Sequence, residues 1–95
     1  MAYSIQITIA KDQTFRSKVL LAMIRVAITV SAEASDVVNT GNRKTFAKAL
    51  LNNPEGHLDR VALAVVADDA TLHTASDAAV ETRVAAVWNA LSGVL

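Results

Sequence analysis

The apolar positions of residues 11–34 recur every three or four residues, which is the repeat of one face of a helix. The first stripe consists of Phe15, Val19, Met23, Val26 and Val30. A second stripe beside it consists of Leu20, Ile24 and Ile28. Because little of the circumference is polar, this segment is predicted to be the main helix and to be buried on several sides, as the centre of the domain. Asp12 or Thr14 can cap its start.

Two shorter helices are predicted after a polar loop at Asp36–Asn42. The first covers Arg43–Asn52. It ends at Asn53, because the residue before a proline avoids helical dihedral angles. Asn53 and Pro54 together also suit the cap and first residue of the next helix, which we expect to run to about residue 67.

The last helix is predicted from a sequence that resembles a capping box, with Thr74 at the cap and Asp77 three residues later. Gly93 is its predicted C-terminal cap. Apolar residues expected on the inner faces of the three shorter helices are Phe46, Ala49, Leu50, Leu58, Val61, Ala62, Val65, Val80, Val84, Val87, Trp88 and Leu91.

The N-terminal segment Ser4–Ala10 fits two interpretations. Its alternation of isoleucine with polar residues is the period of a strand, while Ile5 and Ile9 also lie one helical turn apart. The expected fold is therefore mainly α: a single domain over residues 1–95, built as a compact bundle of about four helices. A short N-terminal arm, residues 1–11, precedes the bundle as a strand or a short helix.

The chain is apolar for its size, since 53% of its 95 residues are hydrophobic and 19% are charged. A domain this small buries only about 60–65% of the surface that its unfolded chain exposes. We therefore expect part of its apolar surface to be covered by neighbouring molecules. The apolar run Val19–Val30 is too short to span a membrane and contains Arg25. The N-terminus does not read as a signal peptide.

The charges are balanced overall but segregated along the chain. Residues 1–48 hold seven basic and three acidic side chains, whereas residues 49–95 hold two basic and six acidic ones. One interpretation is that the two halves pair within the monomer. The other is a polarised subunit, in which the basic surface of one copy meets the acidic surface of the next, as in head-to-tail rings.

No catalytic, cofactor or metal site is predicted. The chain has no cysteine, so thiolate chemistry is excluded. Its two histidines, His57 and His73, have no ligand spacing, and Asp68–Asp69 reads as a solvated loop. The serines lack a nucleophile-elbow context and the three glycines form no phosphate-binding loop.

A nucleic-acid interpretation remains as the alternative. Arg43, Lys44 and Lys48 lie on one helical face and could contact phosphates, so Arg43–Ala67 is the candidate pair of helices for a small helix-turn-helix DNA-binding regulator. Against this, the few aromatic residues fall mostly on apolar helix faces. A third alternative is a helical protein-binding module of a cellular complex.

Several short motifs, spread over most of the chain, occur together in one known group of proteins. They are Asp12-x-Thr14-Phe15-Arg16, Asn42-Arg43 followed by Ala47-Lys48, Asn53-Pro54-Glu55, Ala67-Asp68, and Ser76-Asp77 leading to Val87-Trp88-Asn89. With them the chain resembles small helical virion proteins encoded among tailed-bacteriophage structural genes. The resemblance implies a ring subunit of the neck, head–tail connector or adaptor type, and it carries over no catalytic residues.

We therefore expect a non-enzymatic structural subunit that forms a homo-oligomeric ring. Its expected partners are other virion proteins, such as a portal-like ring or tail proteins, with no membrane partner and no cofactor. A contact with nucleic acid stays open, and it is not expected to be sequence-specific. The expected location is the virion, assembled in the host cytoplasm, and not a secreted or membrane form. The predicted contact residues are Arg43, Lys44 and Lys48 on one side, and Glu55, Asp59, Asp68 and Asp69 on the other.

Overall fold

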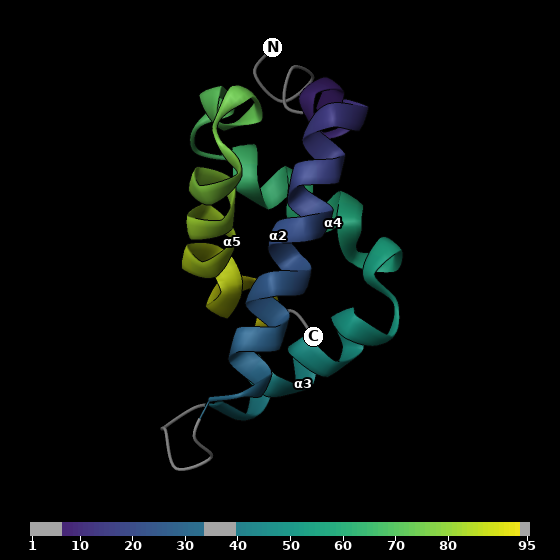
Figure 1. Cartoon of the computed structure of the whole chain (residues 1–95), viewed down its shortest axis with the longest axis vertical. Coiled ribbons are helices and arrows are strands. Elements are labelled where there is room, and N and C mark those ends of the chain that lie inside the picture. The colour runs from purple at the N-terminus through teal and green to yellow at the C-terminus, as the bar shows by residue number, and fades with distance from the viewer. Residues whose placement is uncertain (1–6, 34–39, 94–95) are drawn as a thin grey trace.

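The computed structural model describes residues 7–33 and 40–93 of the chain. Its elements are the helices α2 (Gln13–Ser31), α3 (Thr40–Asn52), α4 (Pro54–Val66) and α5 (Asp77–Ser92), with the short 3-10 helix η1 (Ala70–Thr74) before α5. The described residues contain no strand. The predicted mainly α bundle is confirmed, and it is elongated, with extents of 42 × 21 × 21 Å (Figure 1).

Helix α2 is the centre of the fold, as its pattern predicts. It crosses the front of the molecule in Figure 1 and contacts α3, α4 and α5. Its first stripe is buried, with Phe15, Val19 and Met23 fully inaccessible. Asp12 caps its start, because the carboxylate accepts a hydrogen bond from the amide of Phe15 at 3.0 Å.

The other helices complete the core around two aromatic rings. Phe46 of α3 and Trp88 of α5 are both fully buried, and their ring centroids lie 4.8 Å apart. On α4, the guanidinium of Arg60 lies 5.3 Å from the centroid of Phe46. Arg60 also donates to the carbonyl of Leu91 at 3.3 Å, so one side chain joins three helices.

Among the later helices, the predicted caps Asn53 and Gly93 are confirmed, and the predicted cap Thr74 is wrong. Asn53 caps α4 by accepting from the amide of Gly56. The cap of α5 is Ser76, which accepts from the amide of Ala79 at 3.2 Å, and not Thr74. The reason is local: residues 70–74 wind into η1, whose own cap is Asp69, so Thr74 already lies inside a helical turn.

Two further expectations change at the edges of the helices. Helix α3 begins at Thr40, so residues 40–42 belong to a helix and not to the predicted loop, while residues 36–39 of that loop lie outside the described residues. Residues 7–10 of the N-terminal arm are helical. Ile9 and Ala10 pack against the core there, which a helical turn permits. Residues 1–6 of the arm lie outside the described residues.

Candidate assembly surface

Arg43, a predicted contact residue, is engaged inside the monomer. Its Nε and Nη2 atoms donate to the two carboxylate oxygens of Glu33 at 3.1 and 2.9 Å, and Nη1 donates to the side-chain oxygen of Asn89. This two-point pairing holds the guanidinium in one orientation. Arg43 therefore joins the start of α3 to the segment after α2 and to α5, and it is not a free cation for a neighbour.

Lys44 belongs to the same group of contacts, which we call the joint and which consists of Glu33, Arg43, Lys44, Trp88 and Asn89. Its ammonium group donates to the carbonyl of Glu33. Trp88 of α5 completes the joint by donating its indole N–H to the carbonyl of Arg43 at 3.3 Å. Sequence reasoning missed these contacts, because Glu33 and Trp88 lie far from residues 43–44 along the chain and no local spacing reveals them.

The joint makes stability depend on pH. Hydrogen bonding to Arg43 lowers the pKa of the Glu33 carboxyl from its ordinary value of 4.5. A lowered folded-state pKa means that the stabilisation is fully present above pH 4.5 and is lost as the pH falls through the folded-state value.

We expect Glu33→Gln to destabilise the domain by about 1 kcal/mol at pH 7, because the ion pair is partly buried but still reached by water. As the pH falls from 7 to about 3, the difference between wild type and variant should shrink, since the stabilisation by the carboxylate is lost progressively below pH 4.5. Urea unfolding at both pH values measures the difference. An equally large difference in the free energy of unfolding between wild type and Glu33→Gln at pH 3 would contradict this role for Glu33.

The predicted acidic contact residues are also largely engaged internally. Asp59 of α4 pairs with Arg16 of α2, which lowers the pKa of the Asp59 carboxyl. Asp68 pairs with Arg83 at 2.8 Å. Asp69 caps η1 by accepting from the side chain and the amide of Thr71, and these hydrogen bonds lower its pKa.

Both interpretations of the charge segregation find some basis in these contacts. Arg16–Asp59 and Arg25–Glu81 join the basic half of the chain to the acidic half within the monomer. Lys48 on α3 and Glu55 on α4 are exposed, and neither takes part in an ion pair among residues 7–33 and 40–93. Of the seven predicted contact residues, these two are therefore the ones best placed to meet another molecule.

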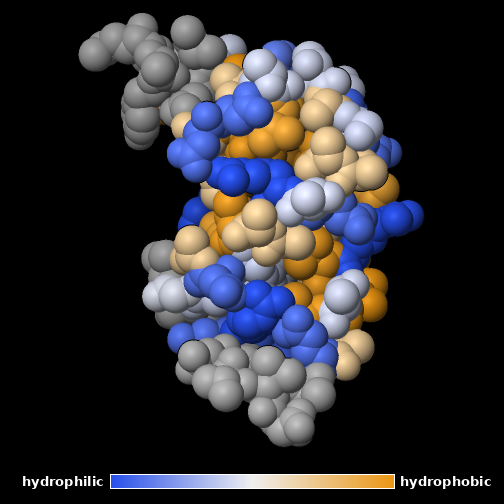
Figure 2. Space-filling model, turned by 90° about the vertical axis from the view of Figure 1, so that its left-hand side faces the viewer, coloured by the Kyte–Doolittle hydropathy of each residue, from blue (hydrophilic) through white to orange (hydrophobic). Residues whose placement is uncertain are grey.

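Large apolar side chains are also exposed, chiefly on the outer side of α2. Leu21 and Ile28 are 46% and 57% exposed, and Ile24 between them is half-buried. Leu51 on α3 and Leu63 on α4 are each 38% exposed. Figure 2, which views the side of the molecule on which α5 lies, shows apolar patches there interrupted by hydrophilic side chains.

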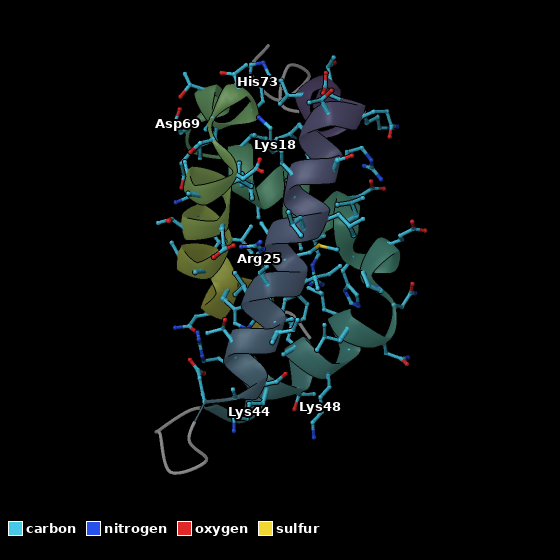
Figure 3. The ribbon with its side chains drawn as sticks, in the orientation of Figure 1. Lys18, Arg25, Lys44, Lys48, Asp69 and His73 are labelled. Atoms are coloured by element: carbon cyan, nitrogen blue, oxygen red, sulfur yellow. The ribbon has the colours of Figure 1, made fainter. Side chains whose placement is uncertain are left out.

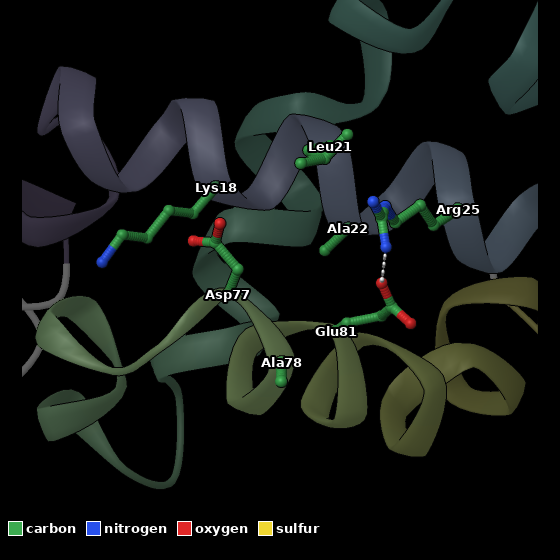
Figure 4. Close-up of a pocket in the computed structure, with 7 residues that line it drawn as sticks. All are labelled: Lys18, Leu21, Ala22, Arg25, Asp77, Ala78 and Glu81. Carbon is green, nitrogen blue, oxygen red and sulfur yellow. Dashed lines mark ion pairs between the residues drawn. The ribbon is translucent and has the colours of Figure 1, made fainter.

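A shallow hollow of about 290 Å³ lies between α2 and α5, next to the exposed side of α2 (Figure 4). Ala22 and Ala78 are among its lining residues. Two cations of α2, Lys18 and Arg25, face a row of carboxylates on α5, and Arg25 approaches Glu81 to 3.7 Å. Lys18 instead donates to the carbonyl of Ala75 at 2.9 Å. Charges of both signs thus line one edge of the outer surface of α2.

The two histidines have separate roles. The ring of His57 packs edge-on against Phe46, with centroids 5.5 Å apart, and His73 contacts the carbonyl of Ala70 at 2.9 Å. Within the part of the chain that the structure describes, no three histidine, aspartate or glutamate side chains are grouped so as to hold a metal ion. The described helices include none with the length and hydropathy needed to cross a membrane.

No protein-family model matches the chain, and no curated protein or solved structure matches it either. The residues that carry the phage resemblance have structural roles in this fold. Asp12, Asn53 and Ser76 each cap a helix, and Arg43 forms the joint with Asn89.

Proposed function

We propose that this chain is a non-enzymatic structural subunit that assembles with copies of itself into a ring. By its resemblance to small tailed-phage virion proteins, we place the ring in the neck or the head–tail connector of such a particle. Its partners there would be a portal-like ring or tail proteins. The mechanism is geometric: the subunit holds its neighbours in place and performs no reaction.

The observation that carries the self-association in this proposal is the apolar surface of α2. The helix buries its first stripe in the monomer, yet Leu21 and Ile28 still point outward with about half of their surface accessible. Removing such side chains from water contributes about 25 cal/mol for each Å² of apolar area. Contact with another molecule is the favourable outcome for this surface.

The two unpaired charges support a head-to-tail arrangement. Lys48 and Glu55 have opposite signs and lie on different helices, so one copy can offer Lys48 to the Glu55 of the next. Such a contact joins two different surfaces, and repeated contacts of this kind close into a ring when the rotation between copies allows it. Exposed pairs contribute only about 0–1 kcal/mol each, so they set orientation more than affinity.

Charge reversal tests the head-to-tail contact. We expect Lys48→Glu or Glu55→Lys alone to reduce the population of species larger than a dimer in native mass spectrometry at low salt. The double variant Lys48→Glu with Glu55→Lys should restore it, because the attraction returns with its signs exchanged. Lys11→Glu is the matched control on an exposed lysine outside the contact.

Loss without recovery in the double variant, or no loss at all, would contradict the proposed contact. Lys44 is unsuitable for this test because it holds the joint at Glu33. Steep, salt-dependent binding of duplex DNA in a fluorescence-anisotropy titration would instead favour the regulator.

A further inference from the structure

We infer that the outer side of α2 is a second, separate assembly contact, at which two copies of this chain pair antiparallel about a two-fold axis. We call this surface the α2 seam. It consists of Ser17, Leu21, Ile24, Ile28 and Ser31. The inference rests on the proposed self-assembly, and it goes beyond the ring because it assigns the apolar surface of α2 to a two-fold contact distinct from the contact of Lys48 with Glu55.

The α2 seam has the spacing of a helix–helix contact. Its residues follow one another at intervals of four, three, four and three, which is the heptad repeat of paired helices. The seam spans about 21 Å along the helix axis, at 1.5 Å per residue. Its serines and its two terminal apolar residues are exposed, and Ile24 is half-buried. The described elements of the monomer therefore leave most of the seam uncovered.

The order of residue types along the seam is the same in both directions, with a serine at each end and three apolar residues between them. A two-fold contact requires such self-complementarity, because residue i of one copy meets residue j of the other and the reverse. In the antiparallel arrangement, Leu21 of one copy faces Ile28 of the other. Ile24 then lies next to the axis, and Ser17 lies opposite Ser31.

The charges at the ends of the molecule select the antiparallel arrangement. Lys44 and Lys48 lie at one end of the long axis, and Asp69 lies at the other (Figure 3). A parallel pair would place the two basic ends side by side, where like charges repel. An antiparallel pair places the basic end of each copy beside the Asp69 end of the other.

The edge of the seam fits the same arrangement. Arg25 and Glu81 flank the middle of the seam and form a loose pair, 3.7 Å apart and well exposed. Near a two-fold axis, the Arg25 of each copy can approach the Glu81 of the other, so that the four charges alternate in sign. A stable interface usually buries about 800 Å² on each partner, more than one helix face supplies, so we expect a reversible dimer that depends on concentration.

Cysteine cross-linking tests the geometry directly, since the natural chain contains no cysteine. Ser17→Cys and Ser31→Cys place one thiol at each end of the seam. We expect little disulfide-linked dimer when either variant is oxidised alone, because equivalent positions lie about 21 Å apart. An equimolar mixture should give a linked dimer. Equal yields in all three samples, or linkage of the Ser17→Cys sample alone, would overturn the inference.

Sedimentation equilibrium tests the affinity. We expect Ile28→Glu to raise the dissociation constant of the dimer by about tenfold or more. The matched control is Leu63→Glu, an exposed leucine on α4 outside the seam, which should leave the dimer unchanged. Circular dichroism verifies that both variants fold.

Separate substitutions test the ring contact between Lys48 and Glu55 and the dimer contact at the α2 seam. Glu55→Lys should remove the larger species and spare the dimer, while Ile28→Glu should weaken the dimer. A monomeric wild type, including one that binds a different protein through the seam, would overturn the inference, as would equal effects of Ile28→Glu and Leu63→Glu.

Discussion

Replacing Trp88 with alanine is expected to cost about 3–5 kcal/mol of folding free energy, the largest loss from a single truncation in this chain. Trp88 is the largest fully buried side chain. Its ring packs against Phe46, and its N–H satisfies the carbonyl of Arg43, so truncation leaves a cavity and removes a hydrogen bond from the joint. A domain of this size has about 5–15 kcal/mol of stability in total.

Thermal unfolding at pH 7 should therefore show a fall in Tm of at least about 12 °C for Trp88→Ala. Trp88→Phe is the control, because it keeps most of the packing and removes only the donor, and we expect it to cost about 1–2 kcal/mol. If the two variants were equally stable, Trp88 would not be the centre of the core.

Replacing Met23 with glutamate is expected to destabilise the domain by about 4 kcal/mol or more at pH 7. Met23 is fully buried on the inner side of α2, where an ionised carboxylate would lose its hydration. Burial raises the pKa of such a glutamate, so the loss should shrink as the pH falls towards 4, where the neutral form fits the core better.

The same substitution on the outer side of α2 is the matched control. Ile28→Glu changes an exposed residue of the same helix and should alter stability by no more than about 0.5 kcal/mol in dilute solution. Urea unfolding of both variants at pH 4 and pH 7 measures the contrast. Similar losses in both would contradict the assignment of inner and outer sides to α2.

The helices and their buried faces could be predicted from the sequence because they depend on local periodicity. The spacing of Phe15, Val19 and Met23 identifies the inner side of α2, and all three are buried. The cap of α5 could not be placed correctly, since Thr74 and Ser76 both suit a cap. The choice between them depends on η1, which Asp69 starts and the apolar pattern does not reveal.

The contact residues were harder to predict, because their availability depends on residues far away in the sequence. Arg43, Lys44 and Lys48 look equivalent on one helical face, yet Arg43 and Lys44 are held by Glu33 and Lys48 is not. In the same way Asp59 is paired with Arg16, while Glu55, four residues earlier, stays exposed. Tertiary structure reduces the candidate set to Lys48 and Glu55.

The structure also shows which residues of the second apolar stripe of α2 are buried and which are exposed. From the sequence, Leu20, Ile24 and Ile28 suggest burial on several sides of the helix. In the fold, Leu20 packs against the core while Ile28 and its neighbour Leu21 face outward. The outer side of α2 is therefore the part of the domain that we propose another copy covers.

The mass of the wild-type chain as a function of concentration tests the central claim, self-assembly, most directly. Sedimentation equilibrium with native mass spectrometry, from low to high micromolar protein, is the measurement. We expect a reversible dimer and, at low salt, larger closed species built from it. A chain that stays monomeric throughout this range, with its helical circular-dichroism spectrum intact, would contradict the account.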